Sequence, residues 1–170
     1  SIGPQPIIMI RDKNGDVQLL QNRCPHRGNQ VCVMDKGNAK MFTCPYHSWS
    51  FTNSGEFMGF AFPEGYEGHE DADKTKLGLA KVARVESYRG FIFGSMAEEG
   101  ISLTEHLGGA AATLDQLCET SPEGEVEITA GFLKHQTRSN WKFLVENETD
   151  GYHPAFVHAS IFNVSDSGIG

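Results

Sequence analysis

Long apolar runs are missing from this sequence of 170 residues, and so is any excess of basic residues. No run approaches the roughly 18 apolar residues that a membrane-spanning helix needs, so we expect no membrane partner. Lys and Arg number 14 against 22 Asp and Glu, which gives a net charge of −8. Because no basic stripe is available to displace counterions from phosphates, we expect no nucleic-acid partner either.

Cysteine is scarce, with four residues in the chain. The opening residues also lack the charged and apolar regions of a secretory signal, so we expect a cytoplasmic protein. Cysteines in that compartment are normally reduced. Cys24 and Cys44 lie in a metal-ligand pattern, whereas Cys32 and Cys118 are expected to be small buried residues.

Two metal-ligand pairs lie close together in the first third of the sequence. The first is Cys24-x-His26 and the second is Cys44-x-x-His47. Two Cys and two His are a common structural zinc set. They suit a Rieske [2Fe–2S] centre equally well, because there two His replace two Cys on one iron. Each pair offers one thiolate and one imidazole, so two similar loops could clamp a two-iron cluster from opposite sides.

Short apolar runs separated by turn residues surround these pairs and predict an antiparallel β domain over residues 1–98. Asn14-Gly15 separates the apolar runs 6–10 and 17–20, which is a strong hairpin signal. Other strands are expected at 41–43, 50–52, 56–58, 77–85 and 90–94. Residues 62–76 are polar and predict a surface loop. The ligand pairs are therefore expected on loops carried by hairpins, a usual place for functional residues.

Residues 99–170 show a different pattern and are predicted to begin a second domain, which makes the fold class α+β. Helices are predicted at 101–107 and 110–119, and loosely alternating strands at 126–138. Asn140 is a good N-cap for a helix that runs from Trp141 through Glu148 and on toward Ser160. Its expected buried stripe consists of Trp141, Leu144 and Val145.

Asp150, His153 and His158 form a second candidate metal site. The histidines are five residues apart, and a straight α-helix turns about 140° over that interval, too far for both to share one ion. A kink at Pro154 or a π-bulge would let the two imidazoles converge. Asp150 lies on the same side as His153 and can accept the second ring N–H of a ligating histidine. On the residues alone, two unrelated histidines are an equal alternative.

The residues around both motifs resemble the aromatic-ring-hydroxylating Rieske non-haem iron oxygenases. The matching stretches are Cys24-x-His26-Arg27-Gly28, Cys44-Pro45-Tyr46-His47-x-Trp49, Asn140-Trp141-Lys142, Glu146-Asn147 and Asp150-Gly151-Tyr152-His153, with His158 after them. No extra cysteine accompanies either ligand loop, unlike in respiratory-chain Rieske proteins. The resemblance implies the N-terminal part of a large (α) subunit, with a [2Fe–2S] cluster on the two Cys–His pairs.

The resemblance also assigns roles to the second motif. It implies Fe(II) ligands at His153 and His158, with a third, carboxylate ligand far downstream and outside this sequence. Asp150 is expected to bridge to a Rieske histidine of a neighbouring subunit. Tyr46 is expected near that bridge, and Asn147 is expected near the iron.

The reaction implied by the resemblance is oxygenation of a small aromatic substrate. A ferredoxin or flavin reductase would donate electrons, and the second iron would activate O₂ for hydroxylation or cis-dihydroxylation. The residues around His153 are most similar to the benzoate-like branch, which suggests an aromatic acid. The α subunits are expected to form a trimer, with or without β subunits. The alternative is a Rieske ferredoxin that only carries electrons, but this leaves residues 102–170 unexplained.

Overall fold

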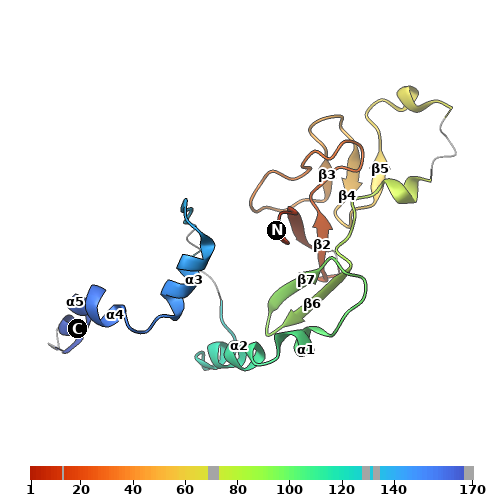
Figure 1. Cartoon of the computed structure of the whole chain (residues 1–170). Coiled ribbons are helices and arrows are strands. Elements are labelled where there is room, and N and C mark those ends of the chain that lie inside the picture. The colour runs from red at the N-terminus through yellow and green to blue at the C-terminus, as the bar shows by residue number, and fades with distance from the viewer. Residues whose placement is uncertain (13, 69–72, 128–130, 132–134, 167–170) are drawn as a thin grey trace. The chain divides into compact units, whose positions relative to one another are not determined.

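The computed structural model describes residues 1–12, 14–68, 73–127, 131 and 135–166 (Figure 1). The chain divides into two compact units, Ser1–Glu127 and Ile128–Gly170, which are described separately. Small antiparallel sheets dominate the first unit, whereas the second contains helices. The predicted α+β class is therefore confirmed. No helix in the described part of the chain has the length and apolar character needed to cross a membrane.

In the described residues of the first unit, three small antiparallel sheets make up the framework (Figure 1). Their strands are β1 (Ile7–Arg11) and β2 (Val17–Gln21), then β3 (Met41–Thr43), β4 (Ser50–Thr52) and β5 (Phe57–Gly59), then β6 (Arg84–Tyr88) and β7 (Phe91–Ser95). The first hairpin turn contains Gly15 at φ +92° and the β4–β5 turn contains Gly55 at φ +88°, a conformation that glycine adopts without a steric penalty. The hairpins predicted around residues 12–16 and 53–55 are confirmed.

The core of the first unit joins the first two sheets. Ile8 lies opposite Leu20 in the first sheet, and Phe42 lies opposite Phe51 in the second. All four side chains are buried and belong to one hydrophobic cluster. Fully burying a side chain of this size contributes about 1.5–3 kcal/mol. Cys24 and Cys44 belong to the same cluster, so the core itself anchors the two ligand loops.

The strand predicted at 77–85 is wrong over most of its length, because β6 begins only at Arg84. Leu79 and Val82 are nevertheless buried. Their N–H groups donate to the carbonyls of Gly55 and Leu19, at 2.7 and 2.8 Å. The apolar pattern before β6 thus reflects a segment that packs across the first two sheets without forming a regular strand of its own.

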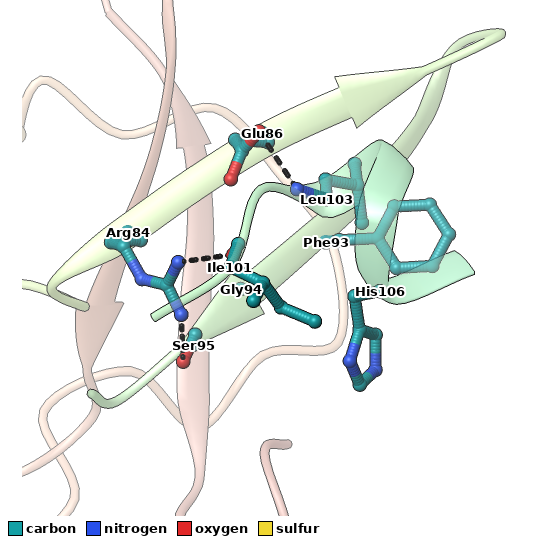
Figure 2. A pocket seen from close by; sticks show the side chains of 8 residues that line it. All are labelled: Arg84, Glu86, Phe93, Gly94, Ser95, Ile101, Leu103 and His106. Atoms are coloured by element: carbon teal, nitrogen blue, oxygen red, sulfur yellow. Dashed lines mark hydrogen bonds between the residues drawn. The ribbon is translucent and has the colours of Figure 1, made fainter. Parts of the chain in front are cut away.

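Arg84 fastens the segment after β7 to the third sheet. Its guanidinium donates to the carbonyls of Ala97 and Ile101, at 3.0 and 2.8 Å, and to Ser95 Oγ at 3.4 Å. Glu86 accepts a hydrogen bond from the backbone N–H of Leu103, at the start of α1 (Leu103–Leu107). Figure 2 shows Arg84, Glu86, Ser95, Ile101 and Leu103 among the residues that line a pocket. The volume of this pocket is about 230 Å³. All three guanidinium nitrogens donate hydrogen bonds within the protein, so the role of Arg84 is structural.

Helix α2 (Ala110–Glu119) is tied to the β6–β7 hairpin by a shared carboxylate. Asp115 accepts from Arg89 Nε at 2.7 Å and from the Tyr88 hydroxyl at 3.0 Å. The Arg89 guanidinium and the Tyr88 hydroxyl lower the pKa of Asp115. Both predicted helices are confirmed. The compact first unit extends to Glu127. The domain boundary expected after residue 98 remains a prediction.

The remaining two cysteines differ in burial. Cys118 on α2 is buried with 1% exposure, as expected. Cys32 is only half-buried, and its Sγ lies 3.7 Å from the carbonyl of Met34, so the expectation of full burial is wrong there. All four cysteines are free.

The second unit contains α3 (Trp141–Thr149), α4 (Pro154–Val157) and α5 (Ala159–Asp166). The predicted N-cap is confirmed, since Asn140 Oδ1 accepts from the N–H of Lys142 at 3.1 Å. The expected buried stripe is wrong, because Trp141, Leu144 and Val145 are 69, 60 and 50% exposed. Apolar side chains of α4 and α5 are exposed as well, for example Phe156 at 67% and Ile161 at 65%, so the described helices of this unit do not pack their apolar sides against α3.

The strands predicted at 126–138 fall partly on residues 128–130 and 132–134, which lie outside the described residues. The described residues of this stretch (126–127, 131 and 135–138) contain no strand.

Candidate metal centres

The two Cys–His pairs lie on loops with the same pattern of backbone hydrogen bonds. The carbonyl of Cys24 accepts from Gly28 N at 2.8 Å, and the carbonyl of Cys44 accepts from Ser48 N at 2.9 Å. Each cysteine N–H donates to the carbonyl five residues on, at 2.8 Å in both loops. The residue that closes each turn has a positive φ, +74° at Gly28 and +57° at Ser48. Two similar turns therefore present the cysteines and histidines.

The loop sequences explain this shared shape. A proline follows each cysteine, Pro25 in the first loop and Pro45 in the second. Proline fixes its own φ near the value that the first turn position requires. Gly28 adopts the positive φ freely, whereas Ser48 carries a side chain in a region that disfavours one.

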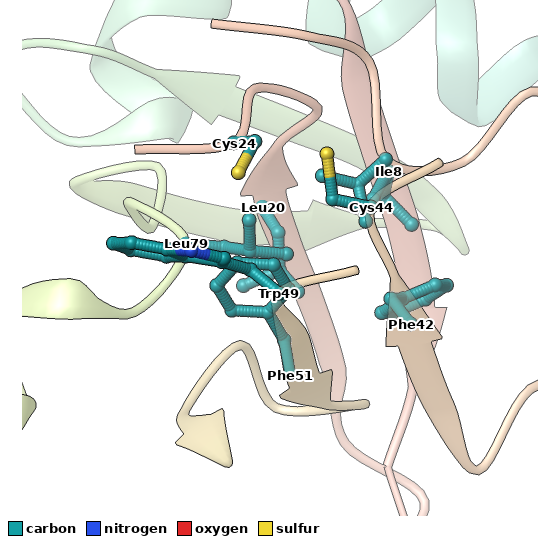
Figure 3. Packing of buried hydrophobic residues seen from close by; sticks show 9 residues of the cluster. Ile8, Leu20, Cys24, Phe42, Cys44, Trp49, Phe51 and Leu79 are labelled. Atoms are coloured by element: carbon teal, nitrogen blue, oxygen red, sulfur yellow. The ribbon is translucent and has the colours of Figure 1, made fainter. Parts of the chain in front are cut away.

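Cys24 and Cys44 are buried, with 3 and 1% exposure. Figure 3 shows their sulfur atoms on the same side of the hydrophobic cluster. Burial raises the pKa of the Cys24 thiol, and the adjacent Cys44 raises it further because two neighbouring thiolates repel each other. A cationic centre bound between the two sulfurs would remove both penalties, because metals bind the thiolate form.

His26 and His47 meet at the tips of the two loops. Their ring centroids are 4.5 Å apart and the rings are inclined by 67°. Within the described part of the chain, His26 Nδ1 is buried without a hydrogen-bond partner. Burial, with the nearby His47 and Arg27, lowers the pKa of His26 and favours the neutral imidazole that binds metals. An orphaned ring nitrogen beside two buried thiols fits a metal cluster.

The donor set of the two loops is two Cys thiols and two His imidazoles. Structural zinc sites and Rieske [2Fe–2S] clusters both use this set.

Tyr46 flanks the second ligand histidine at the exposed end of the loops. Its ring centroid lies 3.8 Å from that of His47, and the side chain is 57% exposed. The Arg27 guanidinium lies 5.9 Å from the centre of the Tyr46 ring. The tyrosine therefore lies beside the predicted cluster ligands, while its functional role remains a prediction.

Tyr66 is a residue near the site that the sequence analysis did not single out. It ends η1 (Pro63–Tyr66), a short 3₁₀ helix inside the stretch that was predicted to be a polar surface loop. Its hydroxyl accepts a hydrogen bond from Trp49 Nε1 at 3.1 Å. The available signal was weak, because Tyr66 is one of two aromatic residues, with Phe62, in this polar, glycine-containing stretch.

Asp150 lies at the break between the first two helices of the second unit. Helix α3 ends at Thr149, and Asp150 adopts an extended backbone conformation. Pro154 is then the first residue of α4, a position at which its missing N–H costs nothing. The prediction of one helix running on toward Ser160, with a kink at Pro154 or a π-bulge, is therefore wrong, because α3 has already ended before Pro154.

His153 and His158 flank the single turn of α4. Their ring centroids are 5.6 Å apart, so the break brings together two histidines that a straight helix would separate. Asp150 Oδ2 lies 3.4 Å from His153 Nδ1, and Asp150 Oδ1 accepts from the N–H of Tyr152 at 2.7 Å. The Tyr152 N–H, and then His153, lower the pKa of Asp150. An ionised carboxylate in this position can orient the neighbouring imidazole.

Asn147 is exposed on α3, in the helical turn before Asp150. Its predicted place near a metal remains a prediction.

Comparison with known proteins first defines a class. Residues 1–67 match the Rieske [2Fe-2S] domain family. This match covers both ligand loops, so the first unit contains a Rieske iron–sulfur domain.

Longer relatives then define the family. The chain is 39% identical over 164 residues to the large subunit of 2-halobenzoate 1,2-dioxygenase from Burkholderia cepacia, and 41% identical over 159 residues to toluate 1,2-dioxygenase subunit alpha from Pseudomonas putida. These alignments cover 93 and 92% of this chain but 34 and 35% of the relatives. A solved naphthalene 1,2-dioxygenase mutant bound to phenanthrene matches with a TM-score of 0.79 at 37% identity, over 91% of this chain and 34% of that one.

The chain is thus a homologue of the large subunits of aromatic-ring-hydroxylating dioxygenases and spans about a third of their length. The Rieske domain and this homology support both predicted cofactors, a [2Fe–2S] cluster and a mononuclear non-haem iron.

Proposed function

We propose that this chain belongs to a terminal oxygenase component that hydroxylates or cis-dihydroxylates an aromatic substrate. The observation that carries the proposal is the presence of two donor groups of different chemistry in one chain. The two Cys–His loops suit an iron–sulfur cluster. The His153–His158 pair, with Asp150 beside it, suits the two-histidine part of a 2-His-1-carboxylate iron site. An electron carrier needs only the first group.

In this proposal Cys24, His26, Cys44 and His47 hold the cluster, and His153 and His158 hold the mononuclear iron together with a carboxylate from outside this sequence. When bound, the cluster supplies single electrons and the Fe(II) supplies O₂ activation. Both cysteines belong to the hydrophobic core, so the core would shield their side of the first centre from water. His47 and Tyr46 are exposed and therefore free to face another protein surface.

Asp150 has two roles in this proposal. It orients His153 through the Nδ1 contact at 3.4 Å, which leaves the Nε2 atom of His153 to bind the metal. Its side chain is also 49% exposed, so it can accept a hydrogen bond from a Rieske histidine of a neighbouring subunit. A quaternary ammonium Rieske monooxygenase described with inter-subunit electron transfer matches this chain with a TM-score of 0.72 at 30% identity, which supports the same route. The route requires an assembly of α subunits, such as a trimer, with or without β subunits.

An aromatic acid is the proposed substrate class. Several relatives are named for carboxylated rings: the 2-halobenzoate, toluate and anthranilate 1,2-dioxygenases, at 39, 41 and 40% identity. An N-demethylase for N,N-dimethyl phenylurea is 39% identical, so both monooxygenation and dioxygenation remain within the proposal. Electrons would come from a ferredoxin or flavin reductase. A cytoplasmic location is part of the same proposal.

Metal content tests this proposal against the electron-carrier alternative. Iron and zinc are measured per chain in the purified full-length protein, which includes the downstream carboxylate, and an EPR spectrum is recorded after reduction with dithionite. We expect a rhombic Rieske signal, the two irons of the cluster, and one further iron. His153→Ala should lose only the further iron and keep the signal. A signal with cluster iron alone in the wild-type protein would favour a carrier, and zinc without a rhombic signal would contradict both functions.

A further inference from the structure

Trp49 connects the two ligand loops through a stacked pair of rings. It follows the second loop in sequence, yet its indole stacks on His26 of the first loop. The ring centroids are 4.8 Å apart and the planes differ by only 4°. Because the indole is 6% exposed, it forms a buried surface against which the imidazole plane rests.

Tyr66 in turn fixes the orientation of the indole. Trp49 Nε1 donates to the Tyr66 hydroxyl at 3.1 Å. The Tyr66 ring stacks on Phe60 at 3.8 Å, with an angle of 11° between the planes. Phe57 and Phe60 contact Trp49 edge to face, at 5.2 and 5.0 Å. The packing contacts restrict the position of the indole, and the hydrogen bond also restricts its rotation within its own plane, because the bond is directional.

We propose that Tyr66 and Trp49 are positioning residues for His26, with the Tyr66 hydroxyl acting through the indole. The inference rests on the proposed role of His26 as a cluster ligand. The short helix η1 lies outside both ligand loops, and its function in this proposal is to place Tyr66 beside Trp49. The orientation of a ligating imidazole affects the electronic properties of its metal, so a change at Tyr66 should reach the cluster without removing a ligand.

The direction of the effect on the reduction potential follows from charge. With neutral histidines, an oxidised cluster of two Fe(III), two sulfides and two thiolates has no net charge, and reduction adds one negative charge. Water near the cluster stabilises the charged, reduced form more than the neutral form. A looser indole that admits water beside His26 should therefore raise the midpoint potential.

The test compares Tyr66→Phe with Tyr88→Phe in the cluster-loaded protein. Both changes remove one tyrosine hydroxyl and one hydrogen bond from the first unit, but Tyr88 bonds Asp115 on α2 and not Trp49. The measurements are the g-values of the reduced cluster by EPR and the midpoint potential. We expect shifted g-values and a raised potential in Tyr66→Phe, and wild-type values in Tyr88→Phe.

Trp49→Phe and the double variant with Tyr66→Phe test whether Tyr66 acts through the indole. Trp49→Phe should produce a larger shift in the same direction, and Tyr66→Phe should add nothing in that background. Wild-type g-values and potential in Tyr66→Phe would overturn the inference, and so would additive shifts in the double variant. Loss of the cluster in Tyr66→Phe would overturn it as well, because the hydroxyl would then be needed for folding. If the wild-type protein gave no rhombic signal, the proposed function itself would fail.

Discussion

Asn22 is expected to control whether the first ligand loop holds its shape. It is a buried polar residue with 7% exposure, two positions before Cys24. Its Oδ1 accepts hydrogen bonds from the N–H groups of Val31 and Cys32, both at 2.9 Å, and its Nδ2 donates to the carbonyl of Cys32 at 2.6 Å. The side chain thereby joins the two ends of the segment that contains Cys24 and His26.

Asn22→Ala should destabilise the protein by about 3 kcal/mol. Each of the three hydrogen bonds contributes about 1 kcal/mol, and a buried donor left without a partner costs about 1–3 kcal/mol by itself. This is a large part of the roughly 5–15 kcal/mol that stabilises a typical domain. For a chain of this size, a loss of about 3 kcal/mol lowers the melting temperature by roughly 6–12 °C. The loosened loop should also retain less iron.

Asn29→Ala is the matched control, because it removes an asparagine from the same loop. Asn29 donates one exposed hydrogen bond to the carbonyl of Gln30, so its loss should cost less than about 0.5 kcal/mol. Thermal unfolding by circular dichroism and iron content per chain are measured for both variants and the wild type. Equal melting temperatures and iron contents for Asn22→Ala and Asn29→Ala would show that the Asn22 side chain does not hold the loop.

Three further changes give distinct outcomes. Ser48→Gly should increase the free energy of unfolding by up to about 1 kcal/mol and so raise the melting temperature, because glycine tolerates the φ of +57° there. A lower melting temperature would contradict this. Asp115→Asn should be less stable than the wild type at neutral pH. The folded-state pKa of Asp115 is lowered, to below 3.8, so the stability difference between the variant and the wild type should disappear as the pH falls through that pKa. Melting curves recorded at a series of pH values measure this. A difference that stays constant with pH would argue against a stabilising Arg89–Asp115 ion pair. Asp150→Asn should keep nearly all iron and the rhombic signal, but reduction of the second centre should be slower by more than about tenfold in stopped-flow experiments. Normal turnover by this variant would exclude the bridging role of Asp150.

Local signals made much of the fold predictable. Asn14-Gly15 predicted the first hairpin because the turn geometry depends on those residues themselves. Asn140 predicted the start of α3 because capping uses the next few backbone N–H groups. The spacing of the two Cys–His pairs predicted the first metal centre for the same reason, since each loop is closed by its own hydrogen bonds.

Features that depend on distant contacts were not predictable. Tyr66 meets Trp49 across 17 residues of sequence, and no local pattern encodes that hydrogen bond. Leu79 and Val82 are apolar because they pack over other strands, so they were misread as a strand of their own. Helix α3 shows an apolar pattern, yet Trp141 is 69% exposed. Periodicity indicates which side chains can be buried, whereas burial itself requires a partner surface.

Oxygenation of an aromatic acid by the full-length protein can be measured in a single-turnover experiment with ¹⁸O₂. The fully reduced protein is mixed with ¹⁸O₂ and an aromatic acid such as benzoate, and the rhombic EPR signal and the labelled product are followed together. We expect the signal to disappear as labelled hydroxylated or cis-dihydroxylated product forms. Disappearance of the signal without labelled product, for a panel of aromatic acids and naphthalene and with both metal centres filled, would contradict the proposed function.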